Sequence, residues 1–246
     1  MRYASPIFLF LLFCCTFSFG KKNVATRKFK PETFKSVKVP EPSDVVYDKE
    51  TGHLFVVSDN GLLYECEAGG AVIRRSPDKG MDFEGVEVKG DYLYISDESP
   101  RRVFKYNKHT LKLEHTYSVP YWAARNSGFE SITYNETKHC FVLISEKNPI
   151  QIFEYNEDFQ QTKEYDFSGA RDISSARWYN GQMYLLSDED MSILRCDPNT
   201  YEVKEKFKID ILNPEGLTFG KDGNVIISAD DLERLYFFKS IPANNE

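Results

Sequence analysis

Histidine is scarce in this chain, and its cysteines form no Cys-x-x-Cys pair or mixed Cys/His motif. The four histidines are His53, His109, His115 and His139. Zinc in proteins is usually held by these two residue types, so the sequence disfavours a zinc site. The Gly-x-Ser-x-Gly turn of serine hydrolases and the glycine-rich loops that cradle phosphates are also missing. The commonest catalytic constellations are therefore absent.

The chain is acidic, with a formal net charge of -7, and its basic residues are too few and too scattered for nucleic-acid binding. Phosphate-backbone binding depends on clustered Lys and Arg, so no nucleic-acid partner is expected. The one basic stretch, between Lys21 and Lys30, is interpreted as a solvated linker over residues 21–33.

Long apolar runs are confined to the N-terminus, where residues 6–19 are apolar except for Thr16 and Ser18. One early positive charge, a short apolar core and the small residues Ser18 and Gly20 are typical of a secretory signal peptide over residues 1–20. The core is too short to span a bilayer, and no transmembrane span is expected in the mature chain. The protein is predicted to be exported to the periplasm or the exterior. A lipid anchor at Cys15 is the alternative.

Three cysteines remain in the mature chain, and in the repeat frame below they fall on different units. They are Cys66, Cys140 and Cys196. We interpret them as small buried hydrophobic residues, with a single disulfide as the alternative. Asn135-Glu136-Thr137 is a formal glycosylation site, relevant only in a eukaryotic secretory host.

One short phrase occurs five times, usually opening with Glu. Its copies start at Glu41, Glu84, Glu130, Ser174 and Glu215, with spacings of 43, 46, 44 and 41 residues. Each copy is followed by a turn and an apolar run that ends in Ser and an acidic residue. Strong helical periodicity is absent. A repeat of 40 to 50 residues with several short strands per unit predicts a β-propeller.

The second repeat shows the strands most clearly. Its expected strands are 84–88, 92–96, 102–106 and 113–119. The fifth repeat ends one strand short, while residues 34–39 alternate like a strand and precede the first repeat. We therefore predict an all-β protein with five blades of four antiparallel strands over residues 34–240. The N-terminal strand is expected to close the ring.

The repeated acids are expected to surround one mouth of the central channel. The innermost strand of a blade begins on the face where the second strand ends, which brings both acidic positions together. The inner ring would hold Glu41, Glu84, Glu130 and Glu215, with Asp172 standing in for the missing Glu of blade four. A second ring would hold Asp59, Asp97, Glu98, Glu146, Asp188, Glu189 and Asp230.

Converging carboxylates repel one another unless they share protons or bind a cation. Calcium accepts six to eight oxygen ligands with tolerant geometry, so the inner ring is a candidate calcium site. The structural alternative is that these acids cap turn amides or keep the face soluble.

At these residues the chain resembles the SdiA-regulated family of bacterial exported proteins. The matching phrases include residues 41–48, 54–60, 128–134 and 185–189, and the resemblance covers about residues 34–239. It implies a five-bladed propeller with bound calcium, distantly similar to NHL-repeat propellers, and no established enzymatic activity. The chain departs from the pattern at Ser174, and at Arg177-Trp178. That pair would either shape a ligand pocket or fill the space between blades.

Two functions remain open from the sequence. The first is a noncatalytic, monomeric binding module whose acidic face contacts a small ligand or an envelope protein. Residues 121, 122, 125 and 126 of a neighbouring loop would be candidate contacts. The second is a calcium-dependent hydrolase of lactones, esters or phosphoesters. The histidines are expected to point away from the mouth, which disfavours the second.

Overall fold

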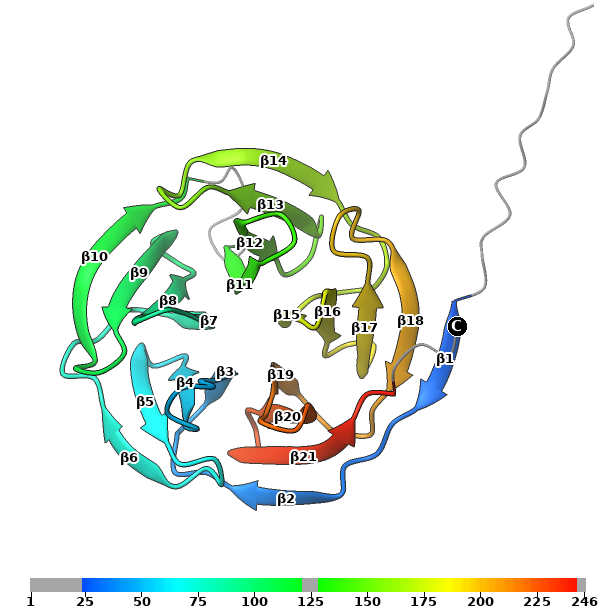
Figure 1. The fold of residues 1–246 in the computed structure, drawn as a ribbon, viewed down its shortest axis with the longest axis horizontal. Helices are drawn as coiled ribbons and strands as arrows, with labels where there is room; N and C mark the ends of the chain where they lie inside the picture. The colour runs from blue at the N-terminus through cyan, green and yellow to red at the C-terminus, as the bar shows by residue number, and fades with distance from the viewer. Residues whose placement is uncertain (1–23, 121–127, 243–246) are drawn as a thin grey trace, which may run out of the picture.

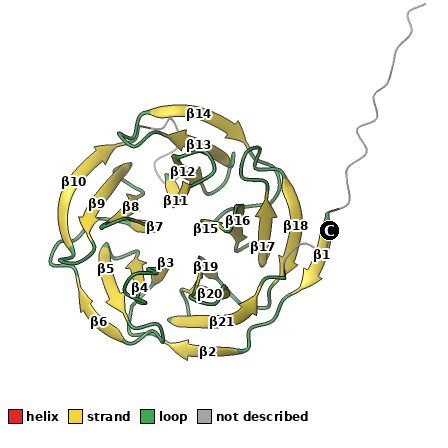
Figure 2. Cartoon of the chain, viewed as in Figure 1, coloured by secondary structure: helices red, strands yellow, loops and turns green. Residues whose placement is uncertain are grey.

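The chain forms five β-sheets arranged as blades around one axis (Figure 1). The computed structural model describes residues 24–120 and 128–242. Within these ranges every regular element is a strand (Figure 2). No helix in them has the length and apolar composition needed to cross a membrane. The predictions for residues 1–20, and for residues 121, 122, 125 and 126, lie outside the described residues.

Each blade contains four strands, ordered from the axis outward. In blades one to four these strands are consecutive in the sequence. Blade one comprises β3 (Pro42–Tyr47), β4 (Leu54–Ser58), β5 (Leu62–Cys66) and β6 (Val72–Arg75). Blade two comprises β7 (Phe83–Lys89), β8 (Tyr92–Asp97), β9 (Arg102–Asn107) and β10 (Lys112–Ser118). Blade three comprises β11 (Phe129–Asn135), β12 (Cys140–Ser145), β13 (Gln151–Tyr155) and β14 (Gln161–Asp166). Blade four comprises β15 (Ser175–Tyr179), β16 (Gln182–Ser187), β17 (Ser192–Cys196) and β18 (Val203–Lys208). These bounds confirm the predicted five-bladed architecture.

Blade five closes the ring with strands from both ends of the chain. It comprises β19 (Pro214–Phe219), β20 (Asn224–Ala229), β21 (Arg234–Ser240) and, outermost, β2 (Thr33–Ser36). β2 pairs antiparallel with β21, and Val37 and Val39 beyond it are buried. The predicted closing strand is therefore confirmed, although pairing ends at Ser36.

One strand was not predicted. Within the segment expected to be a flexible linker, Ala25–Lys28 form β1, which pairs in parallel with β18 at the outer edge of blade four. The linker prediction fails here because the free edge of β18 offers unpaired backbone groups to any adjacent chain. Arg27 adds an ion pair to Glu205 at 2.6 Å, and the Phe29 ring stacks on Phe238 at 4.8 Å. β1 and β2 together form a strap across blades four and five.

The hydrophobic core is divided among the five interfaces between neighbouring blades. The interface of blades one and two, for example, buries Phe55, Phe83 and Tyr106. Aromatic rings meet there edge to face, as Phe83 and Phe104 do at 5.6 Å. Each blade depends on both neighbours for burial, so the ring is one cooperative unit.

The three cysteines are free and buried, as predicted. Burial raises the pKa of Cys66 to about 12 and that of Cys140 to about 11, so both thiols stay protonated and unreactive at neutral pH. Asn135 is also buried, and its side-chain amide donates to the carbonyl of Pro198 at 2.7 Å. The formal glycosylation site is thus not accessible in the folded protein.

Candidate functional site

The innermost strands β3, β7, β11, β15 and β19 surround the axis of the propeller (Figure 1). Their first residues pair with the last residues of the second strands, as Phe83 does with Asp97 and Phe129 with Ser145. The two acidic rings therefore lie on one face. We call this end of the channel the acidic mouth.

Three of the repeated glutamates occupy β-bulges. The pairing of β7 with β8 skips Glu84, and the corresponding pairings skip Glu130 and Glu215. A bulge leaves one residue unpaired and redirects its side chain, and such features often lie beside functional sites. In blade four, where Ser174 replaces Glu, β15 pairs with β16 without irregularity. In blade one the bulge falls on Ser43 rather than on Glu41, so a bulged glutamate is a feature of blades two, three and five.

The residue after the bulge must be small because neighbouring inner strands approach closely. A Cβ on Gly85 would lie 2.7 Å from the backbone nitrogen of Ile132. A Cβ on Gly216 would lie 2.7 Å from the Cα of Asp44. These glycines therefore serve the packing of neighbouring blades.

The tightest acidic cluster joins blade two's bulge to its neighbouring loops. Asp82, Glu84 and Glu98 each offer one carboxylate oxygen, and these oxygens all lie within 4.8 Å of one another. Glu98 accepts a hydrogen bond from the Gly128 amide at 2.9 Å, and Asp82 accepts one from Ser99 at 3.0 Å. Asp82 was not among the predicted ligands, although its position two residues before Glu84 was visible in the sequence.

The carboxyls of the acidic mouth are hard to ionise together. Burial, reinforced by Glu130 and Asp59, raises the pKa of Glu84 well above its ordinary value. Burial and Glu98 do the same to the pKa of Glu130. Burial and the nearby Asp188 raise the pKa of Glu215 to about 8. A divalent cation at the mouth would remove this penalty by favouring the charged forms.

Not every predicted ligand is free to bind. Asp172 is buried and accepts hydrogen bonds from Ser187 Oγ and from the amides of Asp188 and Glu189. It therefore caps the turn after β16, which is the structural role weighed above. Glu41 is exposed and has a positive φ of 48°. Its backbone carbonyl accepts a hydrogen bond from the Asp59 amide.

The carboxylates of the second ring differ in their partners and in their pKa values. Asp97 is buried and accepts from the amides of Met81 and Asp82. Glu146 pairs with Lys147 at 2.6 Å, and Glu189 lies 3.6 Å from the same lysine. Burial, followed by neighbouring acids, raises the pKa values of the rest. They are Asp59, Glu98, Asp188 and Asp230.

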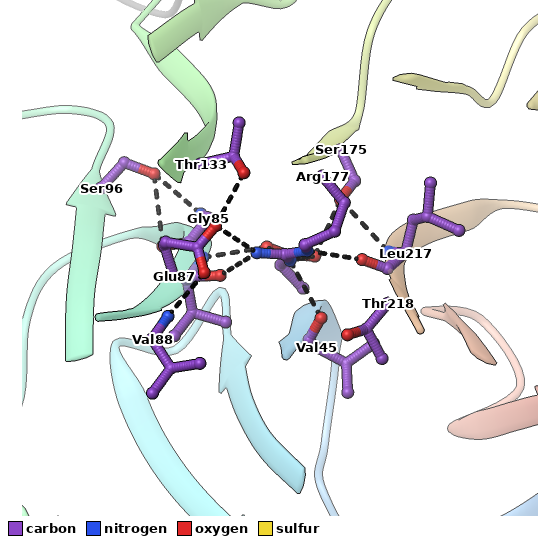
Figure 3. A network of polar contacts seen from close by, with 12 residues as sticks. Val45, Gly85, Glu87, Val88, Ser96, Thr133, Ser175, Arg177, Leu217 and Thr218 are labelled. Atoms are coloured by element: carbon purple, nitrogen blue, oxygen red, sulfur yellow. Dashed lines mark hydrogen bonds and ion pairs between the residues drawn. The ribbon is translucent and has the colours of Figure 1, made fainter. Parts of the chain in front are cut away.

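A second polar cluster, not predicted, joins the inner strands further along their length from the acidic mouth (Figure 3). We call it the hub. It is built from the fourth member of each repeated phrase: Asp44, Glu87, Thr133, Arg177 and Thr218. The signal in the sequence was a polar residue at this position of all five repeats, within otherwise apolar strands.

Arg177 ties the hub together from blade four. Its buried guanidinium donates to Asp44 Oδ2 at 3.0 Å and to Glu87 Oε2 at 3.3 Å. It also donates to the carbonyls of Val45, Val86 and Leu217, at distances of 2.8 to 3.0 Å. Arg177 thus has a role that neither interpretation of the Arg177-Trp178 pair included, because its length and five donors let it span the axis.

The carboxylates of the hub complete its links to the remaining blades. Glu87 accepts from Thr133 Oγ1 at 2.7 Å and from the Tyr134 amide at 3.0 Å. Asp44 accepts from Ser175 Oγ and from the Val86 amide, both at 2.9 Å. Burial nevertheless raises the pKa of Asp44, although Arg177 opposes the shift. All five inner strands are joined in this way.

The histidines lie away from the acidic mouth, as predicted. His53 Nδ1 contacts Glu65 at 2.7 Å, and His109 contacts Asp91 at 3.2 Å, both beside turns of the opposite face. His115 packs edge-on against Tyr117 in an outer strand. None of the four can assist a proton transfer at the acidic mouth.

Comparison with solved structures shows the propeller fold again. The chain is similar to Myxococcus xanthus glutaminyl cyclase, with a TM-score of 0.64 and 14% identity over 88% of this chain and 100% of the other. It is also similar to a protein of unknown function from Bacteroides caccae, with a TM-score of 0.56 and 12% identity. That match covers 77% of this chain and 71% of the other. Such identities establish the fold alone.

The repeated phrases, the bulged glutamates and the closing strand all lie within the part of the chain that one family model covers. That model, named SdiA-regulated, matches residues 28–239. The chain therefore belongs to the SdiA-regulated family.

Proposed function

We propose that this protein is an exported calcium-binding propeller that acts as a noncatalytic binding module in the cell envelope. The observation that carries the calcium proposal is the convergence of Asp82, Glu84 and Glu98 within 4.8 Å. Oxygen-only ligands suit calcium better than zinc or copper. Glu130 lies near enough for Glu98 to raise its pKa, so it would extend the donor set.

The proposal of a binding role rests on the chemistry around the mouth. No histidine reaches it, and the hydrogen-bonding groups of Arg177 are occupied within the hub. Bound calcium would supply charge neutralisation and open coordination positions to an oxygen-bearing ligand.

One observation favours the hydrolase as a second candidate. Glu215 is outside the proposed ligand set of Asp82, Glu84, Glu98 and Glu130. With its pKa raised to about 8, it would hold a proton at neutral pH and could donate it to a leaving group. Turnover of a lactone, ester or phosphoester by the calcium-loaded protein, abolished by Glu215→Gln, would favour the hydrolase over the binding module.

Calcium titration by calorimetry tests the central proposal. We expect one calcium ion per chain and a higher melting temperature in calcium than in chelator, because a ligand that binds only the folded state stabilises it. Glu84→Gln should weaken binding at least tenfold, about 1.4 kcal/mol, by removing a charged ligand. The matched control is Glu114→Gln on the exposed outer strand β10. A protein that binds no calcium at millimolar concentration would contradict the proposal.

The export proposal rests on the N-terminal sequence and is tested by the mass of the mature protein. Cleavage after residue 20 should give an N-terminus at Lys21. A mature protein that begins at an acylated Cys15 would instead be anchored to the membrane by lipid. An intact Met1 in cell-envelope fractions would contradict the cleavage prediction.

A further inference from the structure

A cavity lies at the other end of the channel, beyond the hub. Its volume is about 320 Å³, and every blade contributes to its wall. Arg177, Glu87 and Thr218, which belong to the hub, also line it. The calcium proposal makes no use of this cavity, and we call it the far pocket. Its volume is at the small end of the range for small-molecule sites.

Aromatic side chains form much of the wall and are held in place by their neighbours. Tyr179 stacks on Phe219 with centroids 4.1 Å apart and planes inclined by 4°. Trp178 donates its indole N–H to Thr137 Oγ1 at 3.2 Å. Tyr134 donates its hydroxyl to Glu157 at 3.2 Å and lies under the ammonium of Lys89. Fixed aromatic surfaces of this kind favour a ligand with a flat or bulky apolar group.

Most charged groups of the far pocket are paired with a group of opposite charge. Lys89 forms an ion pair with Glu157 at 2.9 Å. Lys108 is buried and bonded to Asp48 at 3.3 Å and Glu50 at 2.6 Å. Arg177 is paired with Asp44 and Glu87 in the hub. These groups are not available to a ligand.

Two charges of opposite sign remain on the rim. Lys49 and Glu136, which come from blades one and three, both line the far pocket. Within residues 24–120 and 128–242 neither forms an ion pair, and the Lys49 ammonium lies 5.8 Å from the centre of the Tyr179 ring. A plain anion or a plain cation would leave one of them unmatched. A zwitterion would satisfy both.

We propose that the far pocket binds a free α-amino acid with an aromatic or large aliphatic side chain. Lys49 pairs with its carboxylate and Glu136 with its ammonium group, while the side chain lies against Trp178 and Tyr179. The small volume selects a single amino acid rather than a long peptide. Because the hub separates the two ends of the channel, this site does not depend on the calcium proposal.

Fluorescence of Trp178 provides the test. The chain has two tryptophans, so Trp122→Phe leaves Trp178 as the only indole. L-phenylalanine and L-leucine should produce a saturable change in emission with millimolar or tighter affinity, while glycine, which lacks a side chain, should not. N-acetylphenylalanine and phenylalaninamide each lack one charge, and each should bind at least tenfold more weakly. Titrations in chelator should give the same constants.

Two variants assign each charge to its partner. Lys49→Gln should weaken the binding of phenylalanine at least tenfold. It should leave the affinity for phenylalaninamide unchanged, because the amide offers no carboxylate. Glu136→Gln should weaken the binding of phenylalanine by a similar factor and leave the affinity for N-acetylphenylalanine unchanged. Lys112→Gln, on the exposed strand β10, is the matched control and should bind like the parent. Equal affinity for the zwitterion and both derivatives overturns the proposal, as does the lack of any saturable change with phenylalanine or leucine.

Discussion

Arg177→Met is expected to destabilise the propeller by about 3–5 kcal/mol, because it leaves two buried carboxylates without their cation. Asp44 and Glu87 are buried, and their oxygens point at the guanidinium that the substitution removes. Three backbone carbonyls, from Val45, Val86 and Leu217, would also lose a donor. Urea unfolding at pH 7, followed by fluorescence, measures the loss.

The matched control is Arg27→Met, which removes the same charge from the partly exposed pair with Glu205. Pairs exposed in this way contribute about 0–1 kcal/mol, so the control should unfold near the wild-type midpoint. Adding Asp44→Asn to Arg177→Met should recover part of the stability, since a neutral amide replaces an unpaired charge. If Arg177→Met costs no more than Arg27→Met, the hub does not stabilise the ring.

The stability of the metal-free protein is expected to fall as pH rises from about 5 to about 8. The folded-state pKa of Glu215 is raised to about 8, and burial also raises the pKa values of Glu84 and Glu130. Between the unfolded and folded pKa values the folded state binds more protons than the unfolded state, so the free energy of unfolding decreases with pH. Each unit of separation corresponds to about 1.4 kcal/mol, of which solvent at the open mouth screens a part. In chelator, the melting temperature at pH 8 should be lower than at pH 5 by on the order of 10 °C.

Two comparisons isolate the cause of this slope. Glu215→Gln removes one titrating carboxyl, so in chelator at pH 8 the variant should be more stable than the wild type. Calcium should flatten the wild-type profile by stabilising the ionised mouth. The pKa values of Asp48 and Asp190 are instead lowered, by hydrogen bonds and neighbouring cations, so these carboxyls stay ionised and do not contribute in this window. Stability that rises between pH 5 and pH 8 in chelator would contradict the predicted carboxyl cluster.

The sequence was sufficient for the fold because each blade repeats the same local pattern. Phrase spacing located the inner strands, and the expected strands of blade two agree with β7 to β10 to within about one residue. The closing strand could be predicted because the fifth repeat lacked one of its four strands and an unpaired strand preceded the first repeat. β1 was missed because its four residues are all exposed and carry no apolar alternation. Its position is determined by the edge of β18, which no local pattern reveals.

The candidate site was predicted less completely, because contacts across the axis join blades that are distant in sequence. The acidic mouth followed from topology, but turn capping by Asp172 and clustering of Asp82 with Glu98 depend on loop conformations. The hub was missed for a related reason. The fourth members of the phrase differ chemically, and only their convergence shows that one arginine serves two acids and three carbonyls.

The strap has a consequence for how the protein is made. Thr33 pairs with Phe237 and Ser36 with Arg234, so blade five joins the two ends of the chain. Such nonlocal pairing carries a large loop-closure entropy and slows folding. A nascent chain cannot complete the ring until its last strand has left the ribosome, and removal of β21 would separate β2 from β20. Ring closure is therefore expected to follow release of the full chain, an order that is compatible with the export proposed above.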